Sequence, residues 1–177
     1  LSTIHLDSPF GPRAVSLQER QMEMLRDRIK GLERKIVEMV RHGQDNSALH
    51  ERLQRWTRAL MLTADPADLP AVLVRDLQQQ FLVPQAALRV WDVAPAHAGA
   101  AFASGVSEDT HIFATSLTQP YCGANAGFEA VRWLDEPTAA ASIAMMPLRR
   151  SAADPAFGLL LLASPDATRY NADMATD

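Results

Sequence analysis

The sequence predicts an α+β protein in which a long N-terminal coiled-coil helix precedes a small domain of antiparallel sheet and helices. Three observations support this fold class. No proline occurs between Arg13 and Thr63, apolar residues recur every seven positions within that segment, and short apolar runs separated by proline and glycine follow it. We therefore divide the chain into an irregular leader over residues 1–14, a coiled-coil helix over 15–62 and a domain over 63–177.

A heptad pattern predicts the long helix and its partner. Isoleucine at position a and leucine at position d favour a parallel two-stranded coiled coil, so we expect a homodimer. Ser16 is the expected N-cap, and Glu19 would complete a capping box. The a positions are Met22, Ile29 and Ile36, and the d positions are Leu25, Leu32 and Met39.

The heptad pattern weakens over residues 41–47, where position a reaches Gly43 and position d reaches Asn46. A continuous helix is favoured over a break, because one glycine inside a helix costs only about 1 kcal/mol. The alternative is an antiparallel hairpin within one chain, with its turn at 41–47. A second apolar stripe follows, and we expect three of its residues to extend the dimer interface: Leu53, Trp56 and Leu60.

Charge and composition exclude several classes of protein. Residues 13–62 hold 11 Arg/Lys against 7 Asp/Glu, whereas residues 63–177 hold 6 against 13; with Asp7 these balances of +4, -7 and -1 give the net charge of -4. This acidic total argues against a general nucleic-acid binder. The single Cys122 excludes an internal disulfide framework and a multi-cysteine zinc site. No apolar run reaches the roughly 18 residues of a membrane span, and we expect a cytoplasmic protein.

The domain is expected to contain helices and strands in a definite order. The last two strands should pair antiparallel across a short polar turn, and the final strand should be central or covered on both faces, because all of its residues are apolar. We expect a helix from Asp65 and Pro66 to a point before Pro84, followed by a strand over 86–93 and a loop over 94–107 with a short strand at 101–103. Next we expect a strand or short helix over 111–115, a loop over 119–127 and a short helix over 128–134. The last two strands are expected over 141–148 and 157–163.

This order of elements resembles a GAF domain, a small sensory α+β fold placed behind signalling helices. Three stretches resemble more closely the proteobacterial family catalogued as domain of unknown function family 484. They are residues 13–21 (RAVSLQERQ), residues 120–123 (PYCG) and the closing segments 158–166 (GLLLLASPD) and 171–177 (NADMATD). The resemblance implies a small-molecule pocket, and it implies a recombinase-related protein partner, because family members are often encoded beside a site-specific tyrosine recombinase. A GAF domain normally closes with a C-terminal helix, and we expect that helix to be missing, since the sequence ends at Asp177.

A pocket in such a fold would be mostly apolar with a few polar anchors. Phe102 comes from the same strands and loops as the aromatic ligand candidates named below. For each of these aromatic residues, packing in the core is the alternative role. For Cys122, packing or pocket lining is favoured over redox chemistry, because there is no resolving cysteine. The residues that we expect to contact a ligand are Trp91, Phe113, Tyr121, Cys122, Trp133 and Met145.

No pattern in the sequence indicates catalysis. A Gly-x-Ser-x-Gly motif, a glycine-rich phosphate loop and histidines at metal-ligand spacing are all absent from the sequence. We therefore expect a non-enzymatic dimeric sensory or regulatory module that binds a small molecule, and the sequence does not identify a cofactor. The alternatives are a scaffold or adaptor protein with a vestigial pocket and a redox or thiol-sensing protein that uses Cys122.

Overall fold

The computed structural model describes residues 12–175, with side chains described over residues 17–174. The chain divides into two compact units, the first ending at Glu51 and the second beginning at Arg52. Most of the expected leader lies outside the described residues. The described residues of the first unit are all helical, whereas the second unit contains the sheet.

Helix α1 runs over Pro12–Met61 and is continuous through Gly43. The predicted continuity is confirmed, and the hairpin alternative is wrong, because residues 41–47 are helical. The proposed N-cap at Ser16 is also wrong, since the helix begins four residues earlier. Within the polar interval 41–47, Ser47 Oγ donates a hydrogen bond to the Gly43 carbonyl one helical turn earlier, at 3.0 Å.

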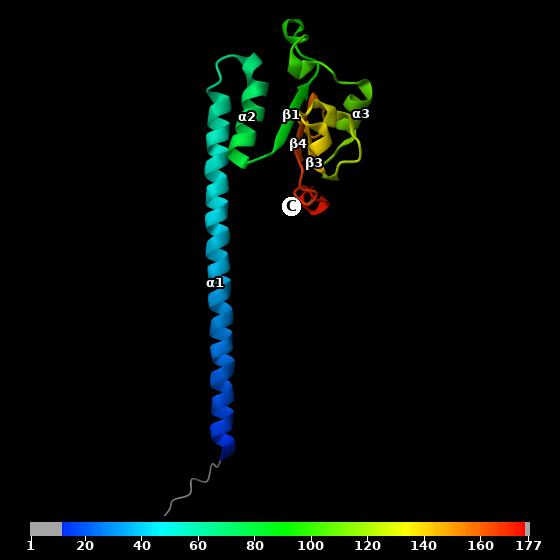
Figure 1. Ribbon diagram of the computed structural model, residues 1–177. Coiled ribbons are helices and arrows are strands. Elements are labelled where there is room, and N and C mark those ends of the chain that lie inside the picture. Colours follow the sequence, from blue (N-terminus) through cyan, green and yellow to red (C-terminus); the bar gives the residue numbers. More distant parts are fainter. Residues whose placement is uncertain (1–11, 176–177) are drawn as a thin grey trace, which may run out of the picture. The chain divides into compact units, whose positions relative to one another are not determined.

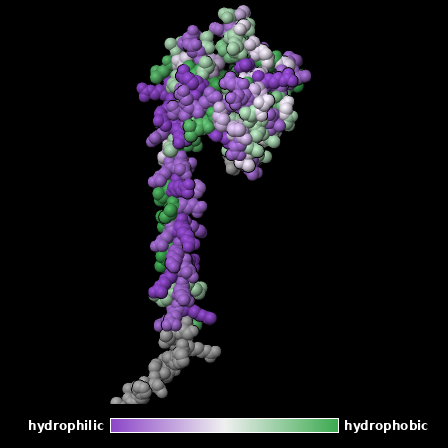
Figure 2. Space-filling view, in the orientation of Figure 1, coloured by the Kyte–Doolittle hydropathy of each residue, from purple (hydrophilic) through white to green (hydrophobic). Residues whose placement is uncertain are grey.

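The heptad side chains of the first unit are exposed. Hydrophobic side chains recur among hydrophilic ones along α1 (Figure 2). Five of the predicted interface residues are between 52% and 59% exposed: Met22, Leu25, Ile29, Leu32 and Ile36. Within this unit an apolar stripe therefore lacks a covering surface.

The second unit is an α+β fold, as predicted. Its four-stranded antiparallel sheet has the order β1-β4-β3-β2, with α2 and α3 on opposite sides (Figure 1). The helices are α2 (Leu69–Phe81) and α3 (Glu108–Ser116), and the strands are β1 (Gln85–Val90), β2 (Tyr121–Ala124), β3 (Ser142–Leu148) and β4 (Gly158–Ser164). Strand β4 lies between β1 and β3 and pairs antiparallel with both, which confirms the central placement expected of an entirely apolar strand.

Strand alternation divides the sheet residues between two faces. Met145 pairs with Leu161 on the side that we call the α3 face, and Met146 pairs with Leu160 on the side that we call the α2 face. The α3 face is the larger core, and four of its side chains are completely buried: Ile143, Met145, Leu159 and Leu161. The α2 face has a smaller core of Leu77, Val83, Leu88 and Leu160.

The end of α1 belongs to the second unit and packs within it. Trp56 Nε1 donates to the Leu73 carbonyl at 3.4 Å, and the Trp56 ring meets Phe81 edge-on with centroids 6.3 Å apart. Leu53 is 45% exposed, whereas Trp56 is partly buried against the α2-face core. The structure thus places Trp56 inside its own chain rather than on an exposed stripe.

Several local predictions differ from the structure. The expected strand at 101–103 is a 3₁₀ helix, Ala101–Ala103. The expected loop over 119–127 contains β2, because its residues pair with β3 from Tyr121 to Ala124 despite the nearby proline and glycines. Residues 111–115 are helical, within α3, and the strand expected to reach residue 93 ends at Val90.

Candidate functional site

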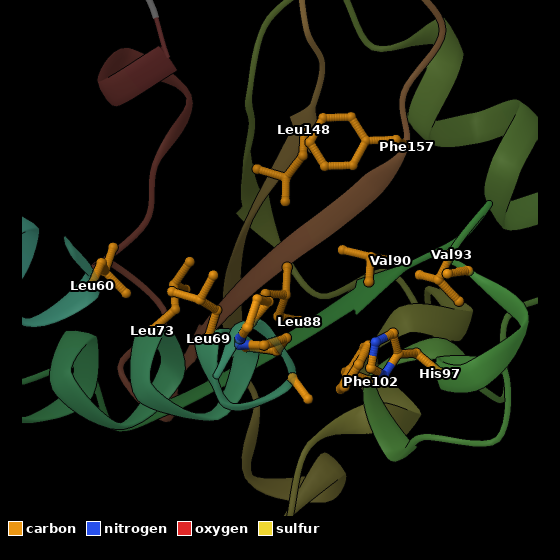
Figure 3. Close-up of a pocket in the computed structure, with 14 residues that line it drawn as sticks. Leu60, Leu69, Leu73, Leu88, Val90, Val93, His97, Phe102, Leu148 and Phe157 are labelled. Carbon is orange, nitrogen blue, oxygen red and sulfur yellow. The ribbon is translucent and has the colours of Figure 1, made fainter. Parts of the chain in front are cut away.

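A concave surface with an almost entirely apolar lining lies on the α2 face of the second unit, and we call it the α2–β1 groove (Figure 3). Its cavity volume is about 460 Å³, within the roughly 300–1,000 Å³ range of small-molecule sites. Fourteen residues line it: Leu60, Pro66, Ala67, Leu69, Pro70, Leu73, Leu88, Val90, Val93, Ala94, His97, Phe102, Leu148 and Phe157.

One wall of the groove is built by the start of α2. Asp65 accepts a hydrogen bond from the Ala67 backbone N–H at 2.8 Å and caps the short 3₁₀ helix Pro66–Asp68, which leads into α2. Proline is tolerated in these first turns because their N–H groups have no helical partner. Leu69 and Leu73 then follow one helical turn apart and present an apolar surface to the groove.

The floor of the groove consists of strand residues that project from the α2 face. Leu88 and Val90 come from β1, and Leu148 comes from the end of β3. Gly158 lies between them, paired with both Val90 and Leu148. A Cβ at Gly158 would lie 2.9 Å from the Arg89 carbonyl oxygen and 2.9 Å from Val90 Cγ1, so only glycine fits this register.

The opposite wall is the segment that follows β1. The Trp91 backbone N–H donates to the Phe157 carbonyl at 2.9 Å, which holds the start of this segment against β4. Asp92 then adopts a left-handed φ of 56°, and the chain turns through the 3₁₀ helices Pro95–His97 and Ala101–Ala103. The His97 and Phe102 rings lie together at one end of the groove, with centroids 6.4 Å apart (Figure 3).

The lining of the groove carries almost no charge. None of the fourteen lining residues has a carboxylate, ammonium or guanidinium group, and His97 is the one ionisable member. A neighbouring depression of about 560 Å³ shares Val90, Val93 and Phe157 with the groove. That depression is polar by contrast, since Asp92, Arg150 and Asp154 contribute to it.

Five of the six predicted ligand residues lie on the other side of the sheet, in or against the α3-face core. Met145 is completely buried there. The Phe113 and Tyr121 rings both pack on Phe128, with centroids 5.5 Å and 5.0 Å away. These aromatic side chains are therefore packed against one another in the core.

The two predicted tryptophans make polar contacts at the edge of this core. Trp91 Nε1 donates to the Ala156 carbonyl at 2.7 Å, and its ring stacks on His111 at 4.5 Å. Trp133 Nε1 donates to the Gly105 carbonyl at 3.0 Å, and the Arg89 guanidinium lies 5.6 Å from the ring centre. Burial lowers the pKa of Arg89.

Cys122 lies on the opposite face of the sheet from the other five predicted residues. In β2 it lies between Tyr121 and Gly123 and pairs with Ala144, so strand alternation directs it to the α2 face. Burial raises the pKa of its thiol, which reduces the thiolate fraction near neutral pH.

A small cavity of about 170 Å³ lies beside Phe113 and Met145. The Glu129 carboxylate lies at its edge and accepts hydrogen bonds from Ser107 Oγ and, at 3.1 Å, from Thr110 Oγ1. The bond from Ser107 is the main reason that the pKa of Glu129 is lowered. This carboxylate therefore occupies the N-terminal end of α3, the position that favours negative charge.

Two features are absent from the part of the chain that the structure describes. In residues 12–175 no three or more His, Cys, Asp or Glu side chains gather in a group that could hold a metal ion. Over the same residues, no helix combines the length and the apolar character needed to cross a membrane.

The groove was not evident from the amino-acid sequence. Of the lining residues, the sequence pointed to Phe102 as an aromatic of a pocket-building loop, but the rest of the lining comes from separate parts of the chain. Proline at 66, 70 and 95 is the sequence signal closest to the groove, because it marks the turns that form its two walls.

Comparison with known proteins identifies a family. No curated protein matches this chain at a significant level. A family model described as "Protein of unknown function, DUF484" matches residues 3–177, which covers both units and nearly the whole sequence. The chain therefore belongs to the DUF484 family.

Proposed function

We propose that this protein is a non-enzymatic dimeric sensory or regulatory module of GAF type, which binds a small molecule in the α2–β1 groove and couples that binding to α1. One observation carries the proposal. Leu60, near the end of α1, lines the groove, and the same helix carries the exposed heptad stripe. A bound molecule would therefore touch the helix that forms the dimer.

A second copy of the chain is the partner that best fits the stripe. Isoleucine at a and leucine at d favour two parallel strands. In a parallel pair, Arg28 at position g lies beside Glu33 of the partner subunit at position e, which is an attractive contact. An antiparallel pair would instead bring g positions together and oppose Arg28 and Lys35, two positive charges.

Coupling requires that the ligand prefer one of two arrangements of α1. Trp56 and Leu60 provide the contacts for such a preference, because one packs on α2 and the other faces the groove. Leu53, one turn earlier, is still 45% exposed and is available to the dimer. The last turns of α1 thus carry residues that contact α2 or the groove and a residue that is available to the dimer.

The dimer is tested with two neighbouring substitutions. Ile36 and Val37 are 59% and 69% exposed, yet only Ile36 lies at an a position. Ile36→Glu should weaken the dimer by about 100-fold or more, because two carboxylates would be buried in the helix interface. Val37→Glu, the matched control, should leave it nearly unchanged. Light scattering over a concentration series measures both, and a wild-type monomer at micromolar concentration would contradict the proposal.

The sensory part is tested separately, with the full chain. A thermal-shift screen of small metabolites should give at least one stabilising compound, since binding to the folded state raises the unfolding temperature. That compound should also change the dimer dissociation constant measured by analytical ultracentrifugation. Binding without any change in that constant would refute the coupling and leave only a binding protein.

Two alternative functions receive less support. A redox or thiol-sensing role needs a reactive thiolate, and burial raises the pKa of Cys122. An adaptor role would use the α1 stripe for another protein, such as the recombinase-related partner that the family resemblance implies. A pull-down with and without residues 13–62 addresses this role: loss of a partner upon deletion would favour an adaptor.

A further inference from the structure

We infer that the ligand of the α2–β1 groove is an uncharged, apolar small molecule, such as a short branched hydrocarbon chain without a carboxylate or a hydrocarbon ring. This inference rests on the proposed function and specifies the chemistry of its ligand. The observations that carry it are the composition of the lining, the cavity volume and the position of the one polar side chain.

The lining cannot compensate a charge. Its residues are aliphatic, aromatic or proline apart from His97, and a charged group taken out of water needs an opposite charge or several hydrogen bonds. The charged side chains of Asp92, Arg150 and Asp154 line the neighbouring depression and do not line the groove. A charged ligand would therefore lose its hydration in the groove without gaining a partner.

The size of the groove favours a small molecule over a protein segment. A cavity of about 460 Å³ is typical of small-ligand sites. The lining residues approach from both walls and the floor, with Leu60 towards one end and Phe102 towards the other (Figure 3). An amphipathic helix would require apolar anchors along several turns, whereas the volume of about 460 Å³ matches a single small molecule.

His97 supplies a sensitive position for testing the inference. Its ring is only partly buried and lies beside Phe102, so that a substitution there changes the charge of the groove without removing a core residue. Val93 supplies a second position, because it lies on the loop wall between the two depressions. A larger side chain at Val93 would fill the groove.

The experiment compares two fluorescent probes that share one aromatic skeleton. N-phenyl-1-naphthylamine is neutral, and 1-anilinonaphthalene-8-sulfonate carries a negative charge. The neutral probe should bind the full-length chain at one site per protomer, and the anionic probe should bind about ten-fold more weakly or worse. An anionic probe that binds as tightly as the neutral one, or more tightly, would overturn the inference.

Three variants locate the binding. Val93→Trp should reduce affinity for the neutral probe by about ten-fold or more by filling the cavity, and His97→Glu should reduce it by a similar factor by adding a charge. Ile112→Trp is the matched control, since Ile112 is 60% exposed on α3, and it should bind like the wild type. Circular dichroism and melting temperature verify folding, and His97→Glu remains decisive if Val93→Trp fails to fold.

The outcomes separate this inference from the proposed function. Equal binding of the neutral probe by wild type, Val93→Trp and His97→Glu would overturn the inference, as would failure of the neutral probe to bind. If the neutral probe binds as expected but the dimer constant does not respond, the ligand class stands and the coupling fails.

Discussion

The two faces of the sheet are built from alternate residues of the same strands, yet they differ in how completely they are filled. On the α3 face, Ile143, Met145, Leu159 and Leu161 are completely buried. On the α2 face, Val90 and Leu148 border an open groove. The residue types are nearly the same on both faces. What differs is the cover, since α3 and its neighbouring turns close one side and α2 closes only part of the other.

This difference indicates which face provides stability and which face is free for binding. A filled apolar core tolerates few changes of volume, whereas a groove has space that a ligand can occupy. The aromatic residues that looked most like pocket residues, such as Phe113 and Tyr121, are on the filled face. Substitutions on the two faces can test this contrast, and we expect the most damaging one to lie in the α3-face core.

Shortening leucine on each face should have unequal effects. Leu161→Ala on the α3 face should lower the free energy of unfolding by about 3–5 kcal/mol, because it leaves a cavity in a completely buried site. Leu148→Ala, at the partly buried groove, should cost about half as much or less. Urea denaturation of both variants measures the difference. Equal losses would mean that the groove face is packed as firmly as the other face.

The cover of the α3 face depends on Arg149. Its guanidinium donates to the carbonyls of Thr115 at 2.6 Å and Leu117 at 2.7 Å, at the C-terminal end of α3, and to the Asp154 carbonyl at 2.9 Å. Positive charge is favourable at a helix C-terminus. Arg149→Met should therefore lower the free energy of unfolding by about 2 kcal/mol.

The adjacent arginine provides the control for this substitution. Arg150 is exposed, and Arg150→Met should change the free energy of unfolding by less than about 0.5 kcal/mol. Thermal denaturation followed by circular dichroism measures both variants. Similar melting temperatures for the two would show that the guanidinium contacts to α3 contribute little to stability.

The smallest expected effect is a lower reactivity of the Cys122 thiol in the folded protein. Because burial raises the pKa of its thiol, the thiolate fraction at any pH below that pKa is smaller in the folded than in the unfolded chain. Iodoacetamide should therefore react more slowly with the native protein near neutral pH, and the native pH–rate profile should lie at higher pH. Rates in buffer and in urea measure this shift. A native profile at lower pH would indicate an activated thiol and revive the redox alternative.

Long, periodic elements were predictable from the sequence, and short ones were not. The proline-free heptads predicted α1, and the uniformly apolar Gly158–Ser164 segment predicted the central β4. Strand β2 has only four residues, which is too few for alternation to stand out among glycine and proline. Because this segment was expected to be a loop, the sequence did not reveal that Tyr121 and Cys122 point to opposite faces of the sheet.

The candidate site was less predictable than the fold, for a physical reason. Leu73, Leu88 and Leu148 are apolar residues in regular elements, and the sequence does not distinguish those that fill a core from those that border a cavity. The distinction arises when the turns after Val90 place Val93 and Phe102 across the groove from α2. Such turns depend on backbone features, for example the left-handed φ at Asp92, that residue spacing does not reveal.

Gly158 limits how the shape of this groove can change during evolution or by design. Any side chain there would collide with the Arg89 backbone as well as with Val90 and Leu148, and a backbone atom cannot move aside as a side chain can. The floor is therefore fixed by the pairing of β1 with β4. A different groove shape would have to arise from substitutions in α2 and in the segment after β1, so related proteins with differently shaped grooves should vary there and retain glycine at this position.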